Sequence, residues 1–277
     1  MYQILLKQDL VPNIHLFKVE APAIARKAQA GQFVMLRVDE KGERIPLTIA
    51  DWNREEGSIS IVFNEVGRTT HKLAALKEGG HILNFVGPLG VPAEIDKFGT
   101  VVCVALGYGI ATIMPIARTL KEAGNRIISL IRAPTKETLF GEKFLGSFSD
   151  ELTIVTGDAS SECLGFIIDP LKEILGNEKI DRVFTVGPVC VMKIVAATTR
   201  PFGIKTMASL NPIMVDGTGM CGCCRVIVGG TTKFACVDGP EFDAHEVDWN
   251  WLMARRCTYS NNVHLPLQYQ CINCAQW

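Results

Sequence analysis

The sequence has no apolar run that approaches the roughly 18 residues of a membrane-spanning helix. Its first residues lack the basic stretch and long apolar segment that mark a secretory signal. Neither sign of charge is in excess, because 28 Lys and Arg stand against 29 Asp and Glu, a formal net charge of −1. These absences argue against a membrane span, export and a nucleic-acid partner. We therefore expect a protein of the cytoplasm.

Cysteine, by contrast, is plentiful and unevenly placed. Ten cysteines occur in 277 residues, and seven of them follow residue 220. Cys103 and Cys190 lie inside apolar runs and are interpreted as small buried side chains. Disulfides are rare in a reducing cytoplasm, so the late cluster of cysteines favours metal ligation. An apolar fraction of 48% and a charged fraction of 21% otherwise fit a globular chain with two modest domains and a smaller module.

The first ninety residues show the pattern of an all-β unit. Short apolar or alternating runs occur at residues 2–6, 15–20, 33–38, 46–50 and 58–63, separated by Gly, Pro, Asp and Asn. A short helix is expected near residues 70–76. Five or six short strands at this spacing predict a small antiparallel barrel.

The pattern changes near residue 99 to alternating strands and helices. A continuous apolar run at residues 101–106 is typical of a parallel strand covered on both faces. Further strands are expected at 127–131, 152–156 and 182–186, with helices near 111–123, 137–144, 166–175 and 189–198. This alternation predicts a doubly wound α/β domain. We divide the chain into the barrel (1–97), the α/β domain (98–208), a cysteine module (209–245) and a tail (246–277).

Two sharp turns in the α/β domain follow buried strands. Gly107 and Gly109 precede a helix, where glycine lets the backbone approach a pyrophosphate and free N–H groups bind it. The G-x-G-x-x-G pattern is incomplete, because its last position is Thr112, so an ordinary tight turn is the alternative. Gly187-Pro188 ends the last strand at the edge where open sheets bind ligands. Asp158 is a further candidate contact, or only a turn or cap residue.

Two barrel segments have the residue types that a flavin needs. Arg44, Pro46 and Thr48 combine a cation for phosphates, a rigid backbone and a hydroxyl at the start of a strand. Thr69 or Thr70 could cap the short helix after Gly67, leaving N–H groups for a pyrophosphate. An ordinary edge strand and an ordinary helix cap are the alternatives.

The late cysteines have the spacing of an iron–sulfur site. Cys221 and Cys224 follow Asp216 so that a cysteine in place of the aspartate would complete C-x4-C-x2-C, the plant-type pattern for [2Fe–2S], with Cys236 as the distant ligand. An expected hairpin at 226–228 and 231–234 joins them. If Asp216 is only a turn residue, Cys223 replaces it as a ligand. Zinc is the rival metal, although zinc sites usually pair two short C-x2-C knuckles.

The tail contains three more thiols. Cys257, Cys271 and Cys274, with His264, could form a second metal site. The alternatives are an unstructured end and a segment that contacts a partner.

Taken together, the motifs resemble the ferredoxin–NADP reductase superfamily. They are RIPLTIAD, VGRTTHKL, GPLG, FTVGPVCVMK, SLNPIMVDGTGMCGCCR and FACVDG, which span residues 44–239. Within that superfamily the match is to the electron-transfer subunits of dihydroorotate dehydrogenase and of NADH-dependent reduced ferredoxin:NADP oxidoreductase, also known as a sulfide dehydrogenase. In the second branch the first cluster ligand is aspartate, as at position 216 here.

The resemblance implies FAD, NAD(H) or NADP(H), and a [2Fe–2S] cluster, with no catalytic residue beyond the cofactors. It also implies a larger flavoprotein partner with [4Fe–4S] clusters, electron bifurcation and an indirect exchange with ferredoxin. The alternative is a subunit of a dihydroorotate or sulfur-compound oxidoreductase. The flavin contacts would be Arg44, Ile45, Pro46, Leu47, Thr48, Val62, Phe63, Gly67, Arg68, Thr69 and Thr70. The nicotinamide nucleotide contacts would be Gly107, Tyr108, Gly109, Ile110, Ala111, Asp158, Gly187 and Pro188. The cluster ligands would be Asp216, Cys221, Cys224 and Cys236.

Overall fold

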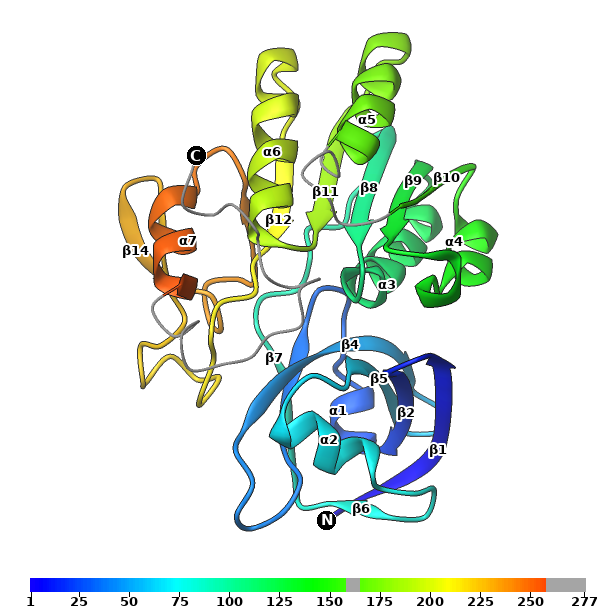
Figure 1. Cartoon of the computed structure of the whole chain (residues 1–277), viewed down its shortest axis with the longest axis vertical. Coiled ribbons are helices and arrows are strands. Elements are labelled where there is room, and N and C mark those ends of the chain that lie inside the picture. The colour runs from blue at the N-terminus through cyan, green and yellow to red at the C-terminus, as the bar shows by residue number, and fades with distance from the viewer. Residues whose placement is uncertain (158–164, 258–277) are drawn as a thin grey trace.

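Antiparallel strands from the first ninety residues curl into a nearly closed barrel, the lower lobe of the computed structural model in Figure 1. The structure describes residues 1–157 and 165–257. The strand order is β6-β1-β2-β5-β4-β3-β7, with two short helices beside it. The bounds are β1 Tyr2–Val11, β2 Ile14–Glu20, α1 Pro22–Ala25, β3 Phe33–Arg37, β4 Ile45–Asn53, β5 Ser58–Asn64, α2 Arg68–Ala74, β6 His81–Ile82 and β7 Asn84–Leu89.

The barrel interior is filled by alternate residues of its strands. Phe17 on β2 and Phe63 on β5 are buried and pack edge to face, with ring centroids 5.1 Å apart. Each such side chain contributes about 1.5–3 kcal/mol by leaving water. Strand β1 runs five residues beyond its expected end at Leu6, because its polar residues face solvent while its backbone continues to pair with β2. Strand β7 was not expected.

The second lobe is a six-stranded sheet in the order β10-β9-β8-β11-β12-β15. Neighbouring strands from β10 to β12 are parallel, and β15 joins the edge antiparallel to β12. The bounds are β8 Thr100–Leu106, α3 Gly109–Glu122, β9 Arg126–Ala133, α4 Glu142–Phe148, β10 Glu151–Thr156, α5 Gly165–Asn177, β11 Arg182–Val186, α6 Val189–Thr199, β12 Thr206–Ser209 and β15 Glu241–Asp243.

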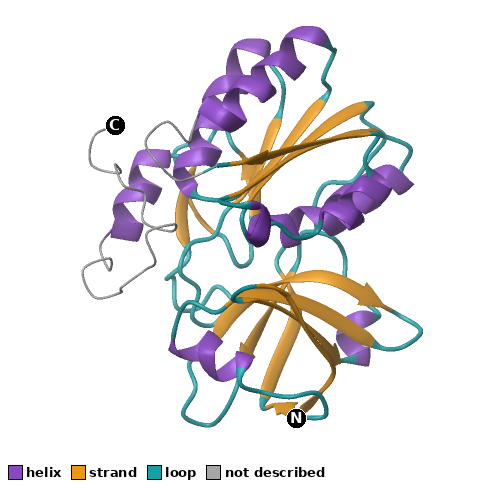
Figure 2. Cartoon of the chain, turned by 45° about the vertical axis from the view of Figure 1, so that its right-hand side comes forward, coloured by secondary structure: helices purple, strands orange, loops and turns teal. Residues whose placement is uncertain are grey.

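Helices cover both faces of this sheet. Ile113 and Ile116 of α3 pack with Leu145 of α4 on one face, and Leu171 of α5 packs with Val195 of α6 on the other. Figure 2 shows the helices on either side of the strands. The doubly wound architecture and the antiparallel barrel expected from the sequence are therefore confirmed. Within the described residues, every helix falls short of the length or apolar character that crossing a bilayer needs.

One expected helix starts later than predicted. In place of a helix near residues 137–144, the chain forms a 3₁₀ turn at Lys136–Thr138, an extended residue at Leu139, and then α4. Gly141 precedes α4 in a left-handed conformation, with φ of 75°. A left-handed residue cannot continue an α-helix, so the helix starts only after it.

The cysteine module folds around a hairpin. Strands β13 (Arg225–Val228) and β14 (Thr231–Phe234) pair antiparallel, as the sequence predicted. Helix α7 (Trp249–Cys257) occupies a region where a tail was expected. Its Leu252 and Met253 are buried in the same apolar cluster as Cys224 and Cys236, and the indole of Trp249 donates to the carbonyl of Ala244 at 2.9 Å. The apolar face of α7 explains why this segment is ordered against the module.

Helix α3 joins the two lobes. Its Arg118 forms an ion pair with Asp51 of β4 at 2.5 Å and lies 4.8 Å from the centroid of the Trp52 ring. One turn and a half earlier, the hydroxyl of Thr112 is 3.1 Å from that of Thr48. The threonine that interrupts the glycine pattern is therefore a contact between the lobes.

Arg118→Ala should lower the free energy of unfolding by about 1–2 kcal/mol, because it removes an ion pair and a cation–π contact from a largely buried side chain. Lys121→Ala is the matched control, since Lys121 lies on the same helix but pairs with Asp150 at the surface. Its expected cost is below about 0.5 kcal/mol. Urea unfolding of both variants measures the difference, and equal losses would refute a joining role for Arg118.

Candidate nucleotide and iron–sulfur sites

The expected nucleotide turns lie side by side at one edge of the parallel sheet. Strands β8 and β11 are hydrogen-bonded neighbours, with Ala105 opposite Val186. The chain leaves β8 through Gly107 and leaves β11 through Gly187. The strand order reverses between these two strands, and such a switch point is where open α/β sheets bind ligands.

Gly109 and Gly187 lie where neighbouring atoms come close to the backbone. A Cβ on Gly109 would lie 2.8 Å from the carbonyl oxygen of Val186, and a Cβ on Gly187 would lie 3.2 Å from the Cβ of Leu106. Ile110 and Ala111 follow at the start of α3 with side chains packed inward, and their backbone N–H groups donate to the carbonyls of Gly107 and Tyr108, each at 3.1 Å. The edge can therefore offer an anion the partial positive charge at the N-terminus of α3.

The turn is also tied to the cysteine module. Asn211, which follows β12, donates from its side-chain nitrogen to the hydroxyl of Tyr108 at 2.8 Å. No spacing signal indicates this contact, because the two residues are 103 positions apart.

The expected flavin residues gather on β4 and β5. Arg44 is exposed just before β4, and Ile45 to Thr48 are half-buried along it. Val62 of β5 is buried with Ala50 in the cluster that includes the nucleotide turn. Phe63 points the other way, into the barrel core, so only its backbone is available to a ligand.

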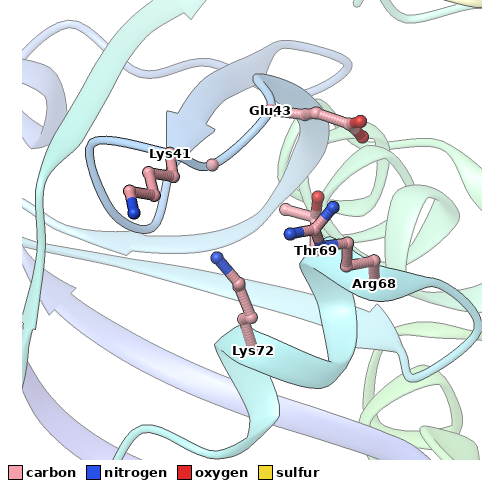
Figure 3. A pocket seen from close by; sticks show the side chains of 6 residues that line it. Lys41, Glu43, Arg68, Thr69 and Lys72 are labelled. Carbon is pink, nitrogen blue, oxygen red and sulfur yellow. The ribbon is translucent and has the colours of Figure 1, made fainter.

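A cationic pocket lies at the start of α2. It is lined by Lys41, Gly42, Glu43, Arg68, Thr69 and Lys72. Figure 3 shows Arg68 and Lys72 projecting from α2 toward the loop that carries Lys41 and Glu43. Lys72 is paired with Asp39 at 2.6 Å. With Lys72 paired to Asp39, the cations Lys41 and Arg68 stand against Glu43, an excess of positive charge that suits a phosphate group. The contributions of Lys41 and Lys72 were not recognised in the sequence.

Thr70 fixes the start of α2. Its hydroxyl oxygen accepts hydrogen bonds from the backbone N–H groups of Val66 at 3.0 Å and Gly67 at 2.9 Å. The helix therefore begins immediately after Gly67, which is its N-cap residue, so the expectation that Thr69 or Thr70 would be the cap was wrong. This contact holds Arg68 and Thr69 at the mouth of the cationic pocket.

The carboxylate of Asp216 organises the cysteine loop. One oxygen accepts from the N–H of Thr218 at 2.8 Å and the other from the N–H of Cys221 at 2.7 Å. The N–H of Thr218 contributes most to holding the pKa of Asp216 below its usual value. The N–H of Met220 and the thiol of Cys221 also lower this pKa, so a metal bound by the carboxylate would replace some of these hydrogen bonds.

The expected ligands come in two pairs. Cys224 and Cys236 are buried with their sulfur atoms 3.2 Å apart, and Cys221 is exposed beside Asp216. Burial raises the pKa of Cys236 to about 12, so a metal must displace its proton to bind it. Among the described residues, no three His, Cys, Asp or Glu side chains converge as ligands of one ion. Two pairs suit a dinuclear cluster, in which each iron takes two protein ligands, better than zinc.

Cys223 lies between these pairs. Its thiol is hydrogen-bonded to that of Cys221, which raises the pKa of Cys223, and its carbonyl accepts from Arg255 of α7 at 3.1 Å. Cys223 therefore stays the alternative to Asp216 as a ligand.

The cysteine loop also packs on the barrel. A Cβ on Gly217 would lie 2.5 Å from Cγ of Met35 on β3 and 3.0 Å from Cδ1 of Leu89 on β7. Gly217 also has φ of 76°, a conformation that glycine adopts without strain. Barrel, nucleotide edge and cysteine loop thus meet at one place. Asp158, His264, Cys271, Cys274 and the side chain of Cys257 lie outside the described residues.

Comparison with known proteins identifies the cysteine module and the relatives of the chain. Residues 211–248 match the iron–sulfur cluster binding domain of dihydroorotate dehydrogenase B. A Thermotoga maritima homologue of the dihydroorotate dehydrogenase B electron transfer subunit is 47% identical over 93% of this chain and 91% of its own length. A probable electron transfer subunit of the same enzyme from Methanocaldococcus jannaschii is 36% identical over 76% of this chain and 78% of its own.

Solved structures agree with these relatives. The structure of an NADH-dependent reduced ferredoxin-NADP oxidoreductase, described for flavin-based electron bifurcation, matches with a TM-score of 0.87 and 43% identity, covering 94% of each chain. Phthalate dioxygenase reductase, 16% identical, shares the fold with a TM-score of 0.58 over 82% of this chain and 85% of its own. Barrel, nucleotide edge and paired ligands define an electron-transfer protein of the flavin and iron–sulfur class. The chain belongs to the family of dihydroorotate dehydrogenase B electron transfer subunits.

Proposed function

We propose that the protein passes electrons between NAD(P)H, FAD and a [2Fe–2S] cluster, and on to a larger partner subunit. When bound, FAD exchanges a two-electron hydride with the nicotinamide and single electrons with the cluster. The observation that carries the proposal is the meeting of three sites: the cysteine loop touches the barrel at Gly217 and the nucleotide turn through Asn211 and Tyr108. Electron carriers must lie close together to exchange electrons.

The roles of individual residues follow from this placement. We assign residues 1–97 to FAD, 98–208 to the nicotinamide nucleotide and the module from 209 to the cluster. The barrel segments around Arg44–Thr48, Val62–Phe63 and Gly67–Thr70 would hold and orient FAD, with the cationic pocket near its phosphates. The N-terminal turn of α3 from Gly107 to Ala111 and the Gly187-Pro188 turn would hold the nicotinamide nucleotide, together with Asp158. Asp216 and Cys221 would bind one iron, and Cys224 and Cys236 the other.

Exposed apolar side chains around the cysteine loop support a protein partner there. Beside exposed Cys221, Met220 is 89% exposed, and three neighbours are nearly half exposed: Ile213, Val215 and Val237. Apolar side chains gathered on a surface are typical of an interaction site. We propose a larger flavoprotein with [4Fe–4S] clusters as the partner, exchanging electrons with ferredoxin indirectly.

The aspartate at the first ligand position favours an electron-bifurcating NADH-dependent ferredoxin–NADP oxidoreductase as the whole complex. The 43% identical structural relative is named for that activity. The names of the sequence relatives favour a second candidate, a dihydroorotate dehydrogenase. Purification of the native complex distinguishes the two, because only one of them oxidises dihydroorotate.

Flavin and iron content test the proposal directly. Protein purified without oxygen should carry one FAD and two irons per chain, with a flavin spectrum overlaid by iron–sulfur bands that bleach on reduction. A colourless protein that binds zinc would overturn it.

Gly109→Ala should weaken NADH binding by about tenfold or more, because the added methyl group meets the Val186 carbonyl and displaces the turn. Gly176→Ala is the matched control, since a Cβ on this helical glycine meets nothing within 4 Å. Titration of flavin-loaded protein with an unreactive NADH analogue measures the dissociation constant. Unchanged affinity in Gly109→Ala would remove the nucleotide from this edge.

Asp216→Cys should retain the cluster but change its reduction potential, because a thiolate replaces a carboxylate as an iron ligand. The potential is measured by redox titration followed by electron paramagnetic resonance. An unchanged potential with full iron content would show that Asp216 does not bind iron.

A further inference from the structure

This inference rests on the proposed function. That function leaves one proton unaccounted for in each hydride transfer. A hydride carries two electrons and one proton, whereas an iron–sulfur cluster takes electrons one at a time and no proton. For each hydride whose two electrons reach the cluster, one proton stays behind in the site and must leave. In the opposite direction one proton must be supplied with two electrons. A group that exchanges this proton should be buried near the junction of the three sites.

Glu241 has the properties of such a group. Both of its carboxyl oxygens are buried, and neither has a hydrogen-bond partner among the described residues. Part of the residue still reaches the surface, so the buried portion is the carboxyl end. An unpartnered buried carboxyl costs free energy that the fold could avoid with an apolar residue.

The backbone at and just before Glu241 contacts segments that lead to the three sites. Glu241 begins β15, opposite Ser209 at the carboxyl end of β12, which is the ligand-binding edge of the sheet. The preceding carbonyl of Gly239 accepts from Val91 of the segment leaving the barrel at 2.6 Å. The carbonyl of Pro240 accepts from Leu210, which leads into the cysteine loop, at 2.9 Å.

The charged surroundings leave Glu241 uncompensated. Glu94 is nearby, but Arg182 at 2.9 Å and Lys205 at 3.2 Å both pair with Glu94. The buried thiol of Cys103 lies within electrostatic reach and carries no charge, because burial raises its pKa to about 12. Asp243 lies on the same strand.

Burial, with a smaller contribution from the charge of Glu94, raises the pKa of Glu241 to about 8. A carboxyl group with a pKa close to the working pH can both give and take a proton. The same group serves either direction of electron flow.

We propose that Glu241 exchanges the proton that accompanies the hydride. When electrons leave for the cluster, the Glu241 carboxylate takes up the remaining proton and passes it to water. When electrons arrive from the cluster, the carboxylic acid gives its proton to the site and is protonated again from water. No oxidant or reductant beyond the nicotinamide and the cluster is needed.

Glu241→Gln tests the proposal in the flavin- and iron-loaded protein. Rapid mixing with NADH should show flavin reduction at the native rate, since hydride transfer needs no separate proton, but cluster reduction slowed by about tenfold or more. Glu246→Gln is the same change at an exposed carboxylate five residues further along the chain, and it should leave both rates unchanged. Equal cluster-reduction rates in the native protein and Glu241→Gln would overturn the proposal.

A spectroscopic measurement on the native protein tests the proposal even if Glu241→Gln does not fold or load its cofactors. Infrared difference spectra of the native protein, grown with glutamate labelled by heavy carbon, should show a protonated carboxyl band that changes when the protein is reduced. A reduction difference without any such labelled band would overturn the proposal. Failure of the proposed function is distinct, because the protein would then lack flavin or iron altogether.

Discussion

Cys236→Ser is expected to abolish the iron–sulfur cluster, with iron content falling at least about tenfold under oxygen-free purification. Cys236 and Cys224 form the buried ligand pair, and their sulfur atoms are 3.2 Å apart. A serine hydroxyl is a poor substitute for thiolate at iron, and it places an unsatisfied polar group in the apolar cluster that surrounds Cys236. Iron and acid-labile sulfide assays measure the loss.

Cys223→Ser is the control for this prediction. Cys223 neighbours the ligand pair but is not required when Asp216 occupies the first ligand position, so the variant should keep its iron. The contrary result, in which Cys223→Ser loses iron and Asp216→Asn retains it, would transfer the ligand role from Asp216 to Cys223. Loss of iron in neither cysteine variant would contradict the cluster site itself.

Glu241→Gln is expected to remove a large pH dependence of stability. In the unfolded chain the carboxyl group titrates near 4.5, whereas in the folded protein its pKa is raised to about 8. The folded state therefore binds the proton more tightly. The stability this supplies is complete below the unfolded pKa and is lost as pH rises through the folded one.

The size of the effect follows from the shift. Each pKa unit corresponds to about 1.4 kcal/mol, so the native protein should lose on the order of 3 kcal/mol between about pH 5.5 and pH 9 through Glu241 alone. Glutamine does not titrate, so the variant lacks this loss. Any loss of stability caused by burying the glutamine amide does not depend on pH, so it cancels when the two pH values are compared.

Urea unfolding midpoints of both proteins at the two pH values measure the difference. The native midpoint should fall on going to alkaline pH by more than the midpoint of Glu241→Gln. Glu246→Gln should follow the native protein, because its carboxyl group is exposed. Parallel pH profiles for Glu241→Gln and the native protein would show that Glu241 is not buried as a neutral acid.

The parts of the fold with strong local signals were predictable. Strand β11 was expected with the bounds that it has, because five consecutive residues from Arg182 to Val186 are buried on both faces of the sheet. The hairpin around Gly229-Gly230 was expected from its turn residues. Where a pattern depends on local chemistry alone, the sequence contains enough information.

Elements fixed by distant contacts were missed. Strand β15 is three residues long and exists because it pairs with β12, more than thirty positions earlier. Helix α7 is stabilised by burying Leu252 and Met253 on the cysteine module, which no local pattern reveals. The helix expected near residues 137–144 starts later because the left-handed Gly141 outweighs the helical preference of its neighbours.

In the candidate site too, features set by local residue types were predictable and features set by distant contacts were not. The ligand spacing from Asp216 to Cys236 and the glycine turns could be identified from residue types alone. The Asn211–Tyr108 bond and the unpartnered oxygens of Glu241 could not, since both depend on which distant segments the fold brings together. Thr112 was noticed only as a departure from a motif, and its contact with Thr48 explains the departure.

Rapid mixing of NADH with the oxygen-free, fully loaded protein tests the central claim most directly. Optical spectra should show the flavin bleaching first, and samples frozen at later times should give the electron paramagnetic resonance signal of a reduced [2Fe–2S] cluster. A cluster that stays oxidised while the flavin is fully reduced, with the partner subunit present, would contradict electron transfer between the barrel and the cysteine module.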